Sequence, residues 1–270
     1  MKDKHDFKER YDCSDLVDIV RILREPGGCP WDAEQTHESI KKNFIEETYE
    51  VIEAINKKDP AMMREELGDV LLQIMLHSDM EREKGVFTFD DVCDEICKKL
   101  IIRHPHVFGD VKVNSTDDVL TNWDAIKMQT KQQTSTTESM ASVPRELPAL
   151  MRSQKIQKKA AKVGFDWDDV SGALEKVHEE TEEVKAAIAG GNTAEMTDEI
   201  GDLLFAVVNV ARFAGVDAEE ALTGAADKFF NRFALVEKFA SERGIDMKTA
   251  GIEKLDALWD EAKVLLGNRQ

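Results

Sequence analysis

Long apolar runs, strand-like patterns and positive charge are all scarce in this sequence. No apolar run approaches the roughly 18 residues of a membrane-spanning helix, and the first ten residues, MKDKHDFKER, are too charged for a secretory signal. β-Branched residues are sparse and none of them form a run of period two, so no strand is predicted. Positive charge is outnumbered, since 36 − 54 gives a net charge of −18. This balance argues against nucleic acid or an anionic membrane as a partner.

Cysteine is also scarce, with four residues and no CxxC pair. We expect Cys13, Cys29, Cys93 and Cys97 to be small buried apolar residues, and the setting to be reducing. Together with the missing membrane signals, this predicts a soluble cytoplasmic protein.

Acidic residues, by contrast, form a pattern. Glu46, Glu47 and Glu50 read EExxE, and after fifteen intervening residues Glu66 and Asp69 read ExxD. Residues three and four apart share a helix face, so each group is expected to lie on one face. An isolated acidic pattern of this kind is usually a solvated helix face, and that alternative has to be weighed first.

The turn between the two acidic groups favours a different interpretation. Asp59 suits a helix N-cap and Pro60 the first helical position, so one helix should end near Lys58 and the next begin at Pro60. With a rise of about 1.5 Å per residue, Glu50 and Glu66 both lie roughly 10–13 Å from that turn. In an antiparallel hairpin the carboxylates would meet at one height. Such a cluster repels itself unless a cation occupies it, and oxygen ligands suit Mg²⁺, Mn²⁺ or Ca²⁺.

The whole arrangement occurs twice, 133 residues apart. The second copy has EExxE at 179–183, ExxD at 199–202, and a different turn, Gly190-Gly191-Asn192-Thr193, which should end one helix with Gly and cap the next. A solvated face has no reason to keep its register across a changed loop. The duplication therefore predicts two related domains, at 1–127 and 148–270, joined by a Gln-, Ser- and Thr-rich linker at 128–147.

Both halves are predicted to be helical bundles in an all-α fold. A first helix capped by Ser14 should stop at Pro26. Further helices are expected over about 38–56, 60–84, 89–103, 117–131, 149–162, 171–189, 193–214, 218–243 and 252–266.

Each half also carries basic and aromatic residues that suit a phosphate-bearing substrate. Lys and Arg stand four apart in KLIIR and in KFFNR, and a WxxxK pattern follows in both halves. Mg²⁺ usually binds through a few carboxylates together with substrate phosphates, whose charge Lys and Arg neutralise. Two metals held by several acids can activate water and stabilise a leaving oxygen. The pattern predicts metal-dependent hydrolysis of a phosphoanhydride.

These motifs, together with GGCPWD, ELGD, RHPHVF and KFxxRF, closely resemble the MazG family of nucleoside triphosphate pyrophosphohydrolases. The resemblance covers both halves except the chain ends and the linker. It implies an all-α NTP pyrophosphatase fold, a homodimer, and Mg²⁺ (with Mn²⁺ as a substitute). It implies hydrolysis of (d)NTPs at the α–β bond to (d)NMP and pyrophosphate in nucleotide-pool house-cleaning.

The resemblance also implies residue roles. The implied metal ligands are Glu47, Glu50, Glu66, Asp69, Glu180, Glu183, Glu199 and Asp202. Glu46 and Glu179 are metal-site or water-orienting candidates, and are taken as catalytic. The implied substrate-binding residues are Lys99, Arg103, Trp123, Lys127, Lys228, Arg232, Trp259 and Lys263. Asn209, which replaces Leu76 of the first half, is a further nucleotide-binding candidate or a buried, satisfied Asn. It favours the second half as the better enzyme.

Two alternatives stay open. One is a narrower dUTPase- or dCTPase-like pyrophosphatase on the same fold. The other is a metal-stabilised, non-catalytic dimerisation or nucleotide-binding module, which would not need Lys228, Arg232 and Lys263.

Overall fold

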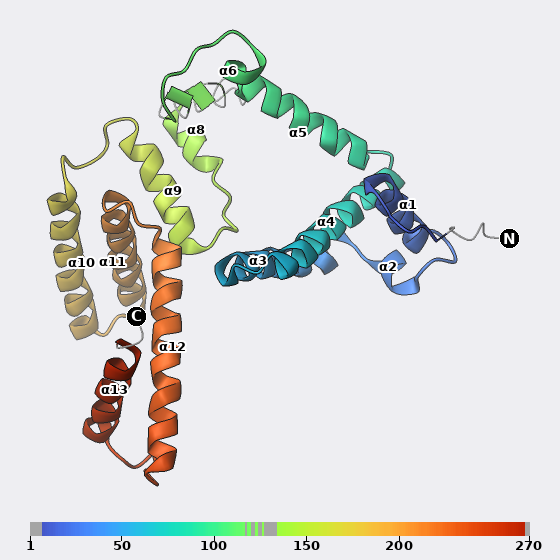
Figure 1. Ribbon diagram of the computed structural model, residues 1–270. Coiled ribbons are helices and arrows are strands. Elements are labelled where there is room, and N and C mark those ends of the chain that lie inside the picture. The colour runs from blue at the N-terminus through green and yellow to red at the C-terminus, as the bar shows by residue number, and fades with distance from the viewer. Residues whose placement is uncertain (1–6, 117, 120–121, 124–125, 127–133, 268–270) are drawn as a thin grey trace. The chain divides into compact units, whose positions relative to one another are not determined.

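The computed structural model describes residues 7–116, 118–119, 122–123, 126 and 134–267. Twelve helices lie entirely within these ranges, and no strand is found in them, which confirms the all-α prediction (Figure 1). The helices of the first half are α1 (Cys13–Arg24), α2 (Pro30–Glu34), α3 (His37–Lys57), α4 (Pro60–Glu83), α5 (Phe89–Arg103) and α6 (Pro105–Phe108). Those that follow are α8 (Thr136–Ala141), α9 (Ala149–Ala161), α10 (Val170–Gly190), α11 (Thr193–Phe213), α12 (Ala218–Glu242) and α13 (Ile252–Gly267). None of these helices is long and apolar enough to cross a membrane.

The chain divides into two compact units, Met1–Lys127 and Met128–Gln270. In the first unit α3 and α4 pack side by side, and α1 packs on α4. In the second unit α10 and α11 form the corresponding pair, α9 packs on α11 and α12, and α13 packs on α12. Each unit is therefore built around one helical hairpin, the element that carries the acidic pattern.

The two hairpin turns follow the sequence as predicted. In the first, α3 ends at Lys57, and Asp59 caps α4 by accepting hydrogen bonds from the backbone N–H groups of Ala61 and Met62. In the second, Gly191 ends α10, and the side chain of Asn192 accepts from the N–H of Ala194. Both turns satisfy backbone groups that a helix end leaves unpaired.

Three short helices were not predicted. They are α2 in the stretch expected to be a turn, α6 after α5, and α8 inside the stretch expected to be a linker. Val143, also in that stretch, is 5% exposed, and Ser139 of α8 accepts a hydrogen bond from Lys159 of α9. The described part of 128–147 is thus folded against the second unit. The domain boundaries themselves stay a prediction.

Two smaller expectations were wrong. Asp12, not Ser14, is the N-cap of α1, because its carboxylate accepts from two backbone N–H groups while Asp15 reaches back to the N–H of Asp12. The four cysteines are free, but none is buried: Cys13 and Cys97 are exposed, and the other two are half-exposed. Composition alone gives no warning of this exposure.

The apolar cores are small. One cluster joins α1, α3 and α4 through Val20, Ile40, Met75, Leu76 and Met80, and another joins α12 to α13 around Phe239 and Leu258. Many large apolar side chains remain exposed on the hairpin helices. They include Ile45, Tyr49, Ile52 and Leu67 in the first unit and Leu174, Ile200, Leu204, Phe205 and Val207 in the second.

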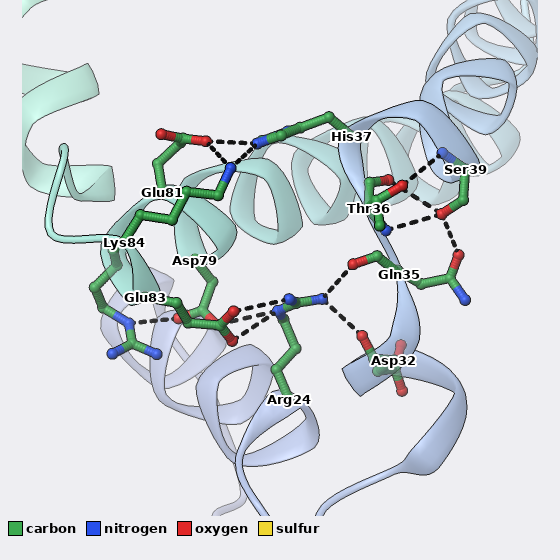
Figure 2. Close-up of polar contacts among 11 residues, drawn as sticks. Arg24, Asp32, Gln35, Thr36, His37, Ser39, Asp79, Glu81, Glu83 and Lys84 are labelled. Atoms are coloured by element: carbon green, nitrogen blue, oxygen red, sulfur yellow. Dashed lines mark hydrogen bonds and ion pairs between the residues drawn. The ribbon is translucent and has the colours of Figure 1, made fainter.

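A buried polar network ties α1 and the α2 region to the far end of α4 (Figure 2). The Arg24 guanidinium, whose side chain is 4% exposed, donates to Glu83 at 3.1 and 3.2 Å and to the carbonyl oxygen of Asp32 at 2.6 Å. It also lies 3.4 Å from Asp79, whose other carboxylate oxygen accepts from Arg82. These long-range contacts fix the end of α4 that lies away from the hairpin turn.

Candidate metal and nucleotide site

The first hairpin brings three of the predicted acids together. Carboxylate oxygens of Glu47 on α3 and of Glu66 and Asp69 on α4 all lie within 4.8 Å of one another, and all three residues are half-buried. Glu50, one turn after Glu46 on the same helix, is half-buried, whereas Glu46 is exposed. The equal-height argument from the sequence therefore describes this hairpin correctly.

Loss of solvent and mutual repulsion both raise pKa values in this cluster. Partial loss of solvent, followed by the charges of Asp69 and Glu50, raises the pKa of Glu47. Loss of solvent and the neighbouring Glu50 carboxylate raise the pKa of Glu66. The cluster holds more negative charge than the chain itself compensates, which is the condition that a bound cation relieves.

The second hairpin repeats the triad with one difference. Oxygens of Glu180, Glu199 and Asp202 lie within 4.8 Å of one another, with Glu180 only 3% exposed. The hydrogen bond from the Lys176 ammonium group lowers the pKa of Glu180, and this effect outweighs the opposite effect of burial. The adjacent Glu180 carboxylate raises the pKa of Glu183. Glu179 is exposed beside them.

The residues present fit a hard divalent cation. Glu180 Oε2 is buried and has no hydrogen-bond partner among the described residues. A buried, unpaired carboxylate oxygen is costly unless a cation or proton meets it. The donors in both triads are all carboxylate oxygens, the type that Mg²⁺, Mn²⁺ and Ca²⁺ prefer over softer metals. The second triad thus offers at least one oxygen for which the chain supplies no partner.

The basic and aromatic candidates form an Arg–Trp pair in each unit. The Arg103 guanidinium lies 5.5 Å from the ring centre of Trp123, and that of Arg232 lies 5.7 Å from the ring centre of Trp259. These distances are those of cation–π contacts. In both arginines Nε is buried without a hydrogen-bond partner in the described part of the chain, so the stacked guanidinium keeps donor capacity.

The remaining basic candidates are placed as follows. Lys99, Lys228 and Lys263 are exposed, and Lys263 pairs with Asp260 at 2.8 Å. Lys127 lies outside the described residues. Trp259 packs partly against the α12–α13 core, so it has a structural role besides any contact with substrate.

A groove of about 790 Å³ lies between α12 and α13. It is lined by predicted substrate-binding residues and by residues that the sequence did not single out. Lys228 and Arg232 line it together with Asn231 and Lys238. Lys238 lies six residues after Arg232, a spacing that does not keep one helix face, so periodicity does not mark it as a member of the basic pair. Asn231 carries no sequence signal either.

Asn209 is buried at 8% exposure, and its amide oxygen accepts a hydrogen bond from Arg212 at 2.7 Å. Arg212 in turn pairs with Asp166. Asn209 is thus satisfied within the chain through its oxygen.

Comparison with known proteins shows the family of the chain. The model of the MazG nucleotide pyrophosphohydrolase domain matches residues 35–108 and 169–236, which include both hairpins. The nucleoside triphosphate pyrophosphohydrolase of Escherichia coli K12 is 44% identical over 251 residues, covering 92% of this chain and 95% of that one. A relative named nucleoside triphosphate pyrophosphohydrolase/pyrophosphatase MazG, from Thermotoga maritima, is 45% identical over 249 residues, or 92% and 94% of the two chains.

A third relative extends the similarity to a longer protein. YabN of Bacillus subtilis, described as uncharacterised, is 49% identical over 254 residues, which is 94% of this chain and 52% of YabN. With two matched domain segments and near full-length relatives, the chain belongs to the MazG nucleotide pyrophosphohydrolase family.

Proposed function

We propose that this protein is a Mg²⁺-dependent pyrophosphohydrolase that cleaves (d)NTPs at the α–β phosphoanhydride to give (d)NMP and pyrophosphate. The observation that carries this proposal is the pair of carboxylate triads at equivalent positions of two hairpins, in a chain whose relatives are named as nucleoside triphosphate pyrophosphohydrolases. The role in nucleotide-pool house-cleaning follows from the same activity.

The carboxylates divide into ligands and a water-orienting group. Glu47, Glu50, Glu66 and Asp69 would hold the ion in the first half, and Glu180, Glu183, Glu199 and Asp202 in the second. When bound, the ion supplies charge neutralisation at the phosphates and lowers the pKa of a water molecule. Glu46 and Glu179 are exposed beside these ligands, where each can accept a hydrogen bond from the attacking water and orient it.

The basic residues would bind the phosphates. Arg232 and Arg103 present guanidinium groups that are held against Trp259 and Trp123, so their orientation is set before substrate arrives. The substrate's phosphates would then be met by the exposed lysines Lys99, Lys228 and Lys263. Lys127, which lies outside the described residues, would join Lys99 in the first half. The groove beside Arg232 has room for a nucleotide, whose base or ribose would border Trp259.

We also propose that the protein is a homodimer. Ile45, Tyr49 and Ile52 are 52%, 53% and 44% exposed on the helix that carries Glu47. Leu204, Phe205 and Val207 are 51%, 42% and 47% exposed on the helix that carries Asp202. A patch of this kind marks a protein interface, and a second copy offers the matching apolar face. Light scattering of the purified chain tests this, since a monomer mass would contradict it.

The activity is tested by measuring pyrophosphate and phosphate release from a panel of NTPs and dNTPs, with and without Mg²⁺. We expect pyrophosphate, only with the ion present. Release of phosphate would overturn the α–β assignment, and turnover of a single pyrimidine dNTP would favour the narrower dUTPase- or dCTPase-like enzyme. No turnover of any nucleotide would favour a non-catalytic module.

Single changes then assign the site. Glu180→Gln and Glu47→Gln each remove a charge from one triad without changing its shape, and Glu182→Gln, on the exposed face of α10, is the matched control. We expect at least one triad variant to lose most of the turnover and the control to keep it. If neither triad variant slowed turnover, the metal ligands would be assigned wrongly.

A further inference from the structure

Lys176 contacts the second carboxylate cluster from within its own helix. Its ammonium nitrogen lies 2.5 Å from Glu180 Oε1 and 2.9 Å from Glu179 Oε1, one turn further along α10. The Glu180 side chain is only 4% exposed, whereas that of Lys176 is 36% exposed. The ammonium group therefore reaches a buried carboxylate from the solvent side and leaves the other oxygen of that carboxylate, Oε2, without a partner in the described part of the chain.

The first half lacks this charge. The position equivalent to Lys176 in the 133-residue register is Asn43, which is neutral. The two triads thus have matching carboxylates, but among the described residues only the second has a positive side chain bonded to one of its members.

We propose that Lys176 is a built-in counter-ion that makes the second site bind a free divalent cation more weakly than the first. The second site then takes up its ion mainly together with the phosphates of the substrate. The proposal rests on the proposed function, because it assigns both triads to metal binding.

The physical reason is charge. A unit positive charge near a divalent ion repels it, and across several ångströms of partly solvated protein this changes affinity by roughly tenfold. Lys176 also lowers the self-repulsion of the empty cluster, so the second hairpin needs the free ion less than the first. A substrate that carries several phosphate charges outweighs one ammonium group and restores binding of the ion.

The test is titration of the full-length chain with Mn²⁺ alone, following the free ion by electron paramagnetic resonance. The first site is removed by Glu47→Gln with Asp69→Asn, so that the second site is read by itself. In this background Lys176→Gln is expected to tighten Mn²⁺ binding by roughly tenfold. The matched control is Lys185→Gln on the same helix, since Lys185 pairs with Glu182 outside the triad, and it should leave the affinity within about twofold.

A reciprocal variant covers the case in which Lys176→Gln fails to fold. With the second site removed by Glu180→Gln and Asp202→Asn, Asn43→Lys is expected to weaken Mn²⁺ binding at the first site by roughly tenfold. Unchanged or weaker binding in Lys176→Gln, or unchanged or tighter binding in Asn43→Lys, would overturn the role of Lys176 while leaving the proposed function standing. A site that binds no Mn²⁺ either in the absence or in the presence of a non-hydrolysable NTP analogue would overturn both the role of Lys176 and the proposed function.

Discussion

Lys58 and Gly191 adopt the same left-handed conformation at the same point of the two hairpins. Their φ angles are 54° and 71°, and each donates its backbone N–H to carbonyl oxygens three and four residues earlier. They are also 133 residues apart, the spacing that relates the two acidic patterns. The changed turn sequence thus keeps one backbone geometry, and this geometry sets both pairs of helices in the register that joins the carboxylates.

This relationship predicts that Lys58→Gly stabilises the first unit. A side chain in the left-handed region costs about 1 kcal/mol, which glycine avoids. The gain expected in urea unfolding is therefore up to about 1 kcal/mol. Lys57→Gly, one residue earlier and still helical, is the control and should instead lose about 1 kcal/mol. A loss in both variants would contradict the role given to this turn.

Removing one partner of the buried Arg24–Asp79 pair should lower the free energy of unfolding substantially. Arg24→Ala takes one partner from Asp79, which is 6% exposed and keeps its ion pair with Arg82. We therefore expect a cost near the lower end of the about 3–5 kcal/mol that breaking a buried pair entails. The free energy of unfolding measures this directly. Arg21→Ala removes an exposed pair with Asp18 on the same helix and should cost under about 1 kcal/mol. Equal effects of the two changes would show that the network in Figure 2 does not hold α1 to α4.

The environment of His77 leads us to expect that the first unit loses stability at acidic pH. Its ring stacks on His37, with the two Nδ1 atoms 2.7 Å apart, so one ring must accept the hydrogen bond. Glu81 and Lys84 lie beside His37, and Phe44 meets the edge of His77. Burial, followed by the charge of His37, lowers the pKa of His77.

The sign of this effect follows from linkage. The folded state binds this proton less well than the unfolded state. The contribution of His77 to stability is therefore complete above the ordinary histidine pKa and is lost as pH falls from about 6.5 toward the lower pKa of the folded state. Urea unfolding at pH 7.5 and 5.5 should show a larger acid loss for the natural chain than for His77→Asn. His178→Asn, an exposed histidine on α10, should behave like the natural chain. The same acid loss in His77→Asn would sink the prediction.

Replacing Arg232 should weaken substrate binding without unfolding the protein. Hydrogen bonds to charged groups contribute about 1.5–3 kcal/mol, so Arg232→Ala should raise KM by roughly ten- to a hundredfold. Arg243→Ala is a matched control just past the C-terminal end of α12, where Arg243 pairs with Glu261 of α13 at 2.7 Å. Steady-state kinetics should distinguish Arg232→Ala from Arg243→Ala, and thermal unfolding checks that both variants fold. An unchanged KM in Arg232→Ala would remove this arginine from the site.

The hairpins were predictable because their signals are local. Asp59-Pro60 and Gly191-Asn192 fix where helices end and begin, and helical periodicity then places Glu47 opposite Glu66 and Asp69. The short helices α2 and α6 were missed because four or five residues carry no periodic pattern. The exposure of Cys13 and Cys97 was missed because composition does not say which helix face a partner covers.

Contacts between distant segments had no such signal. Arg24 and Glu83 are separated by 59 positions, and nothing near either residue marks the other as its partner. Lys176 and Glu180 have an ordinary helical spacing, typical of a solvated ion pair. Only the position of α11 against α10 buries Glu180 and makes that pair part of the second triad.

The sequence by itself determined the long helices, the duplicated acidic hairpins and the family, because helix ends, periodicity and motif spacing are encoded over a few neighbouring residues. The tertiary structure alone decided which carboxylates lose solvent, which arginines stack on Trp123 and Trp259, and that Lys176 makes the two triads unlike. These features depend on what one helix places against another, since burial and charge act between side chains that are close in space and distant along the chain.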